Sequence, residues 1–93
     1  MPSLEAVKEL KVSKNTEAKK LAGTIKHYLC KDGSCVLYAL GSQPICVAVK
    51  SVALLDSMFG LDYHCKISYF HQTSETGDLS GIQFSLYKEI GRE

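Results

Sequence analysis

Apolar residues dominate one long stretch near the middle of the chain, residues 35–57, whose main break is at positions 41–44 (GSQP). The first part, Cys35 to Leu40, shows no alternation with polar residues, a pattern typical of a strand that is covered on both faces. The second part, Ile45 to Leu55, is too long and too rich in alanine for another strand. The pattern therefore predicts a central buried strand that leads into a buried helix.

The break between these two elements has residues suited to a helix start. Ser42 can act as N-cap by accepting a hydrogen bond from a first-turn amide, and Pro44 loses only an amide that has no helical partner there. Gly41 permits the tight reversal and leaves amides exposed at a helix N-terminus, where an anion is favoured. The turn alone is the commoner role of such a glycine, and an anion site at Gly41 and Ser42 is the alternative.

Two shorter elements precede the centre. Residues 9–13 alternate between polar and apolar and predict a strand. From Ala18 onwards, apolar residues recur every three or four positions, which predicts an amphipathic helix that ends at Asp32-Gly33. Asn15 or Thr16 is the expected N-cap of this helix.

Two alternating segments follow the central helix, which is expected to end at Gly60. Residues 61–72 place their odd-numbered side chains on one face and the even-numbered ones, such as Phe70, on the other. Residues 81–90 alternate in the same way, whereas residues 73–80 (TSETGDLS) have the composition of a loop. The two segments therefore predict an antiparallel hairpin.

The predicted element order is β-α-β-α-β-β. Strands joined by a crossover helix run parallel, so the fold is expected to be an α/β chain of the α+β two-layer sandwich type, with a four-stranded mixed sheet and two helices on one face. A single domain is expected over residues 9–90, with a flexible N-terminal extension (1–8) and a C-terminal tail (91–93). Two short helices cannot cover all the tyrosines, so a homodimer, or a tetramer, is expected.

Charge is balanced overall at +1 but uneven along the chain. Residues 1–50 carry eight lysines against four acidic residues, and residues 51–93 carry three basic against six acidic residues. No apolar run approaches the ~20 residues of a membrane span, so no membrane partner is expected. The protein is predicted to be cytoplasmic, or nuclear if the source is a eukaryote, with its four cysteines reduced.

Catalysis and metal binding are both disfavoured by the residues present. His27, Cys30 and Cys35 supply only one close pair of ligands, whereas a structural zinc site needs two. Cys46 lies near a helix N-terminus, where a thiol can be activated, but its neighbours are apolar and no base is near in sequence. We therefore expect no enzyme, no metal and no cofactor, and a role for Cys46 in small-molecule binding or sulfur transfer is a minor alternative.

Lysines suggest binding to phosphate instead. Lys14 precedes the first predicted helix, and Lys19 and Lys20 lie in its first two turns, where cations are unfavourable for the helix but would attract a phosphate. A solvated helix face explains these lysines equally well. Lys50 is the one basic residue of the apolar central helix, where its side chain either extends over the core or faces a partner.

Four short motifs together resemble the stage V sporulation protein S family, which is similar in fold and chain order to Alba, a small dimeric nucleic-acid-binding protein. They are LKVS at 10–13, LAG at 21–23, ALG at 39–41 and AVKSVALL at 48–55. The resemblance covers about residues 10–89. It implies an Alba-like sandwich, usually a homodimer, that binds DNA or RNA without strong sequence preference.

The resemblance can be carried over at three positions. Lys14 falls where Alba proteins have a loop lysine, Gly41 matches a glycine after the second strand, and Lys50 matches a lysine in the second helix of the sporulation family. The chain departs from Alba at Asn15, where a second lysine is usual. It departs again at the acidic tip of the hairpin, residues 75–78, so insertion of this hairpin into a minor groove is not expected.

Two functions from different classes follow. The first is a dimeric, weakly sequence-specific DNA- or RNA-binding protein whose contacts are Lys14, Lys19, Lys20, Gly41, Ser42 and Lys50. The second is a protein–protein adaptor or assembly module that keeps the fold without binding nucleic acid, which the acidic hairpin tip and the surplus tyrosines favour.

Overall fold

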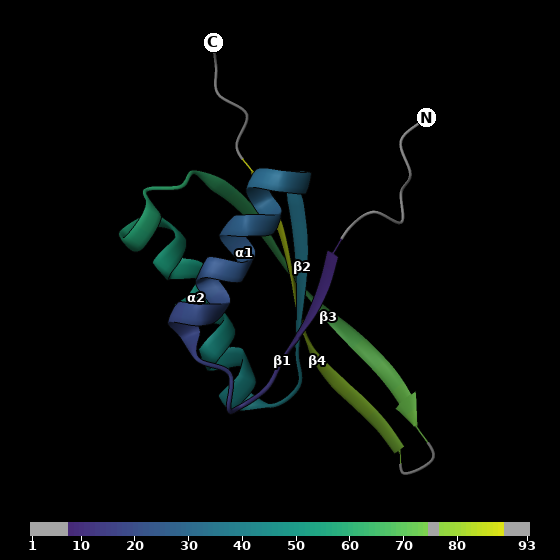
Figure 1. Cartoon of the computed structure of the whole chain (residues 1–93). Helices are drawn as coiled ribbons and strands as arrows, with labels where there is room; N and C mark the ends of the chain where they lie inside the picture. The colour runs from purple at the N-terminus through teal and green to yellow at the C-terminus, as the bar shows by residue number, and fades with distance from the viewer. Residues whose placement is uncertain (1–7, 75–76, 89–93) are drawn as a thin grey trace, which may run out of the picture.

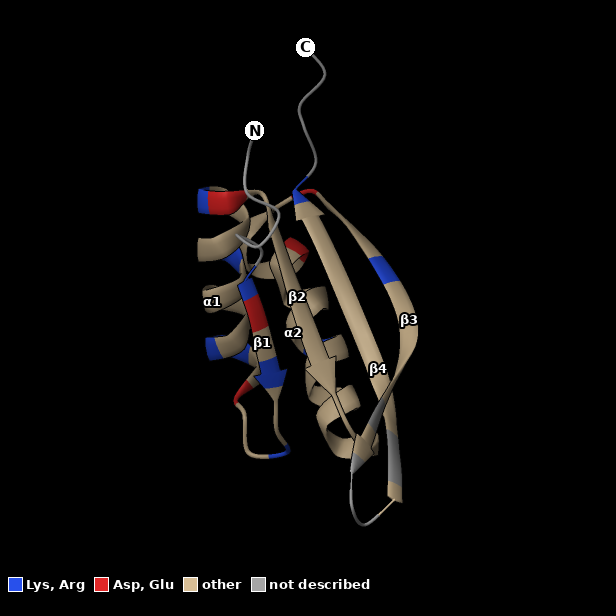
Figure 2. Ribbon diagram, turned by 90° about the vertical axis from the view of Figure 1, so that its right-hand side faces the viewer, with Lys and Arg blue, Asp and Glu red and all other residues tan. Residues whose placement is uncertain are grey.

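The computed structural model describes residues 8–74 and 77–88, which form two layers (Figure 1). Both helices pack on one face of the sheet, and no element of the described chain covers the other face (Figure 2). The predicted element order and the α+β architecture are confirmed. Apart from Lys8, the predicted extension and tail lie outside the described residues. The elements are β1 (Lys8–Val12), α1 (Ala18–Asp32), β2 (Ser34–Ala39), α2 (Ser42–Phe59), β3 (Tyr63–Ser74) and β4 (Gly77–Lys88).

The sheet is mixed, with the strand order β1-β2-β4-β3. β1 pairs with β2 in parallel, and β4 runs antiparallel to both of its neighbours, β2 and β3. Because β1 and β2 are parallel, they end at the same edge of the sheet. The loops that lead into α1 and α2 therefore both start at this edge.

The central strand β2 is buried on one face only. Cys35, Leu37 and Ala39 are completely buried beneath the helices, whereas Val36 and Tyr38 are half-buried on the open face. The prediction that this strand is covered on both faces is therefore wrong. Apolar residues occupy both faces of β2, and this removes the alternation that would have revealed the open side.

Helix α1 has the predicted apolar stripe. Leu21, Ala22, Ile25 and Leu29 are all buried, and these positions are three and four residues apart. The helix ends at Gly33, whose φ of 85° is left-handed and whose N–H donates to the Leu29 carbonyl at 3.0 Å. The predicted end of α1 at this glycine is confirmed.

Helix α2 is longer and more exposed than predicted. It spans 18 residues and buries only Ala48, Ser51 and Leu55 completely. The Ser51 hydroxyl donates to the Val47 carbonyl at 2.8 Å, which satisfies a polar group inside the core. Val49 on the outer side of the helix is 51% exposed. The prediction of a buried helix is wrong because α2 covers the sheet with one stripe only.

The hairpin is also longer than predicted. β3 and β4 pair from Tyr63 opposite Lys88 to Ser74 opposite Gly77, and the end of the hairpin extends beyond the helices (Figure 1). The prediction that residues 73–80 form a loop is therefore wrong. A hairpin that extends beyond the helices has no core to cover and needs no apolar alternation, so a sequence pattern cannot distinguish it from a loop. Glu75 lies outside the described residues.

Gly81 permits a close approach of β4 to the end of β2. A Cβ atom at this position would lie 2.4 Å from the Ala39 carbonyl oxygen, 2.8 Å from Leu40 Cδ2 and 2.9 Å from Phe70 Cε1. Only glycine fits between these groups, so its position fixes how the hairpin joins the body of the sheet.

Candidate functional site

The loop between β1 and α1 is a tight turn that presents Lys14 to solvent. The Ser13 N–H donates to Thr16 Oγ1 at 3.0 Å, the Asn15 N–H donates to Ser13 Oγ at 3.2 Å, and the Thr16 N–H donates to the Ser13 carbonyl at 3.1 Å. These hydrogen bonds use the Ser13 and Thr16 side chains within the turn itself. Lys14 is exposed at the tip of this turn.

The start of α1 has no side-chain cap. Glu17 occupies the N-cap position without a capping hydrogen bond, so the prediction of Asn15 or Thr16 is wrong. Thr16 is not available because its hydroxyl is bound to Ser13. The first-turn amides of α1 therefore have no side-chain acceptor, and no acidic residue lies in that turn.

Lys19 and Lys20 are exposed near this helix start. Lys20 Nζ lies 3.9 Å from Glu17 Oε1, and both side chains are more than two-thirds exposed. An exposed pair of this kind contributes little, about 0–1 kcal/mol, and competes weakly with a bound phosphate. Within the described residues, Lys19 has no ion pair.

The start of α2 is also uncapped. Gly41 takes the N-cap position with φ 96° and ψ 161°, and its carbonyl accepts from the Ile45 N–H at 3.1 Å. Ser42 is the first residue of the helix, so its prediction as N-cap is wrong. The left-handed φ at Gly41 turns the chain so sharply that the helix begins one residue earlier than predicted. Neither a capping side chain nor an acidic residue occupies the first turn of α2.

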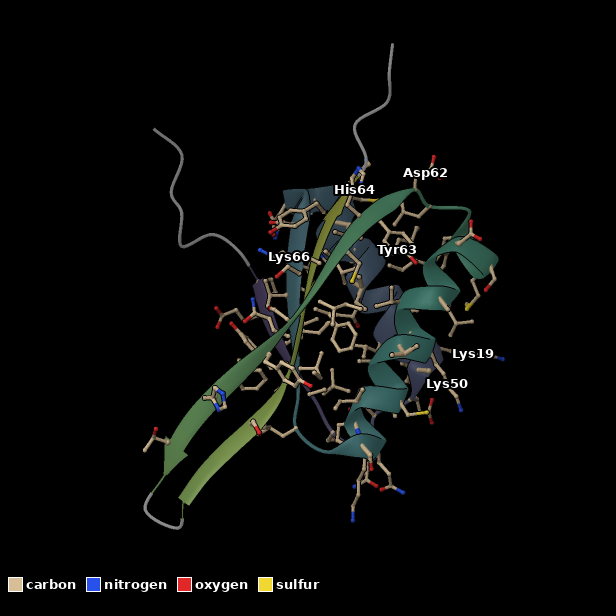
Figure 3. The ribbon with its side chains drawn as sticks, turned by 180° about the vertical axis from the view of Figure 1, so that it is seen from behind. Lys19, Lys50, Asp62, Tyr63, His64 and Lys66 are labelled. Carbon is tan, nitrogen blue, oxygen red and sulfur yellow. The ribbon has the colours of Figure 1, made fainter. Side chains whose placement is uncertain are left out.

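Lys50 lies in the third turn of α2 and is exposed. In Figure 3 the side chains of Lys19 and Lys50 extend to the same side of the molecule, from two helices that pack against each other. Both alternatives for Lys50, a stem that lies over the core and a charge that faces a partner, leave its ammonium group in solvent, as the structure has it.

The ten lysines of the described chain differ in their contacts: Lys20 has the ion pair with Glu17, Lys8 and Lys26 each lie over an aromatic ring, and the other seven have neither. Lys8 and Lys26 lie over the rings of Tyr28 and Phe59, at 5.5 Å and 5.1 Å from the ring centroids. Lys14, Lys19 and Lys50 have neither a ring contact nor an ion pair within residues 8–74 and 77–88. Figure 2 shows that lysines gather on β1, α1 and the loop between them, whereas β2 has none. The structure therefore brings Lys14, Lys19, Lys20, Gly41 and Ser42 to one edge of the sheet, with Lys50 farther along α2.

The four cysteines are free thiols that differ in burial. Burial raises the pKa of Cys35 from 9.0 to about 11, and burial also raises the pKa of Cys65. Cys30 and Cys46 are exposed thiols. Across residues 8–74 and 77–88, no three His, Cys, Asp or Glu side chains come close enough to hold a metal ion.

Sequence analysis missed a pocket on the open face of the sheet. It is lined by Lys11, Tyr38, Leu40, Phe70 and His71. Tyr38 and Phe70 belong to strands that are far apart in sequence, and only the observed strand order brings their rings together. A usable signal was the placement of Phe70 on the even-numbered face of its strand, opposite the helices.

The chain is similar to known proteins in its sequence family and in its fold. A family model described as stage V sporulation protein S matches residues 8–89. No curated protein sequence matches the chain. Among solved structures, Alba from Thermoplasma volcanium has the same fold with a TM-score of 0.61 and 15% sequence identity, covering 86% of this chain and 99% of the Alba chain. In the described part of the chain, neither helix has the length and apolar character needed to cross a membrane.

The family match extends from the first residue of β1 to one residue beyond β4 and includes the four motifs that carry the resemblance. The chain belongs to the stage V sporulation protein S family and has an Alba-like fold.

Proposed function

We propose that this protein binds DNA or RNA with little sequence preference, in a binding rather than a catalytic role. The observation that carries the proposal is the shared edge of the sheet at which Lys14 and the uncapped starts of α1 and α2 lie. Amides at a helix N-terminus attract phosphate through hydrogen bonds and through the helix dipole, and lysine adds full positive charge. The Alba-like fold, which the sequence resemblance links to nucleic-acid binding, supports the proposal.

The contacts of the proposed site are with the phosphate backbone. Lys14, Lys19 and Lys20 are long, exposed side chains and provide point charges without a rigid arrangement for base recognition. Contacts of this kind position a protein on nucleic acid but carry no sequence information. Gly41 and Ser42 contribute backbone amides, and Lys50 extends the charge along α2.

A homodimer is part of the proposal, and exposed apolar side chains support it. Ile67 and Tyr69 lie on the helix side of β3 but beyond the cover of the helices, and they are 62% and 79% exposed. These two side chains are on the same face of β3, two residues apart, and form one exposed apolar patch, which we call the apolar face. A second copy of the chain would remove it from water.

The test is a binding titration with random-sequence duplex DNA and single-stranded RNA, at low and at physiological salt. The variant replaces Lys14, Lys19 and Lys20 by alanine, and the matched control replaces Lys31, Lys66 and Lys88, so that both lose three charges. We expect the first variant to bind at least tenfold more weakly than the control. A folded protein that binds neither nucleic acid at low salt would refute the proposed function, and equal binding by the two variants would refute the site.

A protein–protein adaptor is the second candidate function, and the apolar face is the observation that favours it. Light scattering distinguishes the two. Assemblies larger than a dimer, together with no binding of nucleic acid, would select the adaptor.

A further inference from the structure

The pocket on the open face of the sheet is the feature that the proposed phosphate site does not use. Its volume is about 310 Å³, near the lower limit of roughly 300–1,000 Å³ that is typical of small-molecule sites. No carboxylate is among the described residues that line it, which are Lys11, Tyr38, Leu40, Phe70 and His71. A site of this size and lining suits one planar group with an attached anion.

Two aromatic rings form the wall of the pocket. Tyr38 on β2 and Phe70 on β3 meet edge to face, with centroids 5.0 Å apart and planes inclined by 75°. β4 lies between these two strands. Because Gly81 on β4 has no side chain, Phe70 and Leu40 occupy the space directly beside its Cα atom. The rings are thus held by the backbone of the sheet and not by a mobile loop.

Tyr38 is fixed at its far end. Its hydroxyl donates to Glu9 Oε2 at 3.3 Å. Partial burial, followed by the negative charge of Glu9, raises the pKa of Tyr38, so the phenol stays neutral and keeps this hydrogen bond. The Glu9 carboxylate is therefore engaged by Tyr38 itself.

The basic members of the pocket connect it to the lysine site. Lys11 is exposed at the end of β1, three residues before Lys14. Leu40 lies between the end of β2 and the start of α2, so the pocket is at the same edge of the sheet as both helix starts. His71 is exposed and offers ring N–H donors. Because Lys11 and Lys14 are three residues apart in the chain, we expect one nucleic-acid strand to contact both the lysine site and the pocket.

We propose that this pocket binds one unpaired nucleobase of a single strand, which stacks against Phe70 and Tyr38 while Lys11 and His71 contact its phosphate. The inference rests on the proposed function and deepens it, because it makes single-stranded nucleic acid the favoured ligand. Aromatic rings on an open sheet face accept any base, since every base has a planar surface. Sequence preference therefore stays low.

The test uses a labelled 12-nucleotide oligo(U) RNA, the same backbone with abasic residues, and a 12-base-pair duplex. Phe70→Leu removes the ring and keeps an apolar side chain. We expect it to bind oligo(U) about 5- to 150-fold more weakly than the wild type, the effect of losing one stacked base, with the abasic strand and the duplex unchanged. Tyr87→Leu is the matched control, because Tyr87 is a 48%-exposed ring on the same open face at the opposite end of the sheet.

A second measurement needs no variant. Oligo(U) added to the ¹⁵N-labelled wild-type protein is expected to shift the amide signals of Tyr38, Leu40 and Phe70 as well as those around Lys14. Adenosine monophosphate is titrated in parallel. If it shifts the same pocket amides as oligo(U) does, to the same extent and with the same affinity, the nucleobase site is supported and its ligand is a free nucleotide.

The outcomes separate this inference from the proposed function. If oligo(U) and the duplex both bind but Phe70→Leu has no effect and the pocket amides do not shift, the nucleobase site is wrong and the phosphate site stands. If neither nucleic acid binds at low salt, both are wrong.

Discussion

Gly81→Ala tests the packing between the body of the sheet and the hairpin. The new methyl group would lie 2.4 Å from the Ala39 carbonyl oxygen, a backbone atom at the end of β2 that cannot move without disturbing the β2–β4 pairing. It would also lie 2.8 Å from Leu40 Cδ2 and 2.9 Å from Phe70 Cε1. Forcing extra atoms into a packed site costs about 1–3 kcal/mol, and we expect the upper half of that range because backbone is involved.

Gly23→Ala is the matched control because it adds the same methyl group in the middle of α1. Nothing lies within 4 Å of the added Cβ, so only the helix propensity changes. Alanine in place of glycine in a helix is expected to raise the free energy of unfolding by about 0.5–1 kcal/mol. The two substitutions are therefore predicted to have opposite signs.

The urea midpoint and the melting temperature of both variants are measured at equal protein concentration. Gly81→Ala is expected to lower the midpoint, with a melting temperature roughly 10–20 °C below that of the wild type. Gly23→Ala is expected to raise the urea midpoint by a few tenths molar and the melting temperature by a few degrees. A Gly81→Ala variant as stable as Gly23→Ala would show that the close approach of β4 to β2 is not as described.

Four further predictions concern the core, the thiols and the apolar face. Leu37→Ala, at a fully buried position of the central strand, is expected to lower the free energy of unfolding by about 2–5 kcal/mol in urea titrations. The Cys35 thiol loses its proton near pH 9 in the unfolded chain and near pH 11 in the folded chain. The free energy of unfolding is therefore expected to fall as the pH rises from 9 to 11, and to fall less in Cys35→Ala. Identical pH profiles for the two proteins would contradict this. Iodoacetamide at neutral pH is expected to label Cys30 and Cys46 before Cys35. Ile67→Glu is expected to give a folded monomer in light scattering, and a persistent dimer would exclude the apolar face as the interface.

Local patterns in the sequence were sufficient for the element order. The spacing of Leu21, Ile25 and Leu29 predicted α1, and Gly33 and Gly60 predicted the ends of both helices because a left-handed φ is needed there. The parallel pairing of β1 and β2 followed from the helix between them. These features depend on neighbours along the chain, and such neighbours are visible in a sequence.

Features that depend on tertiary contacts were not predictable in this way. The helix caps at Ser42 and Thr16 were assigned from residue preference, but the backbone conformation of Gly41 and the Ser13–Thr16 hydrogen bonds determined the outcome. The pocket depends on β4 lying between β2 and β3, an order that no local pattern records. The lysine residues are exposed in the structure, and their role in binding stays a prediction.

The salt dependence of binding tests the central claim most directly. Each phosphate contact on duplex DNA contributes about −0.9 to the slope of log K against log salt concentration. If each copy of a dimer contributes two or three lysine contacts, the wild-type slope is predicted to lie between about −3.6 and −5.4, and Lys14→Ala is predicted to reduce its magnitude by about 1.8. A Lys14→Ala slope equal to that of the wild type would contradict the assignment of phosphate binding to the loop between β1 and α1.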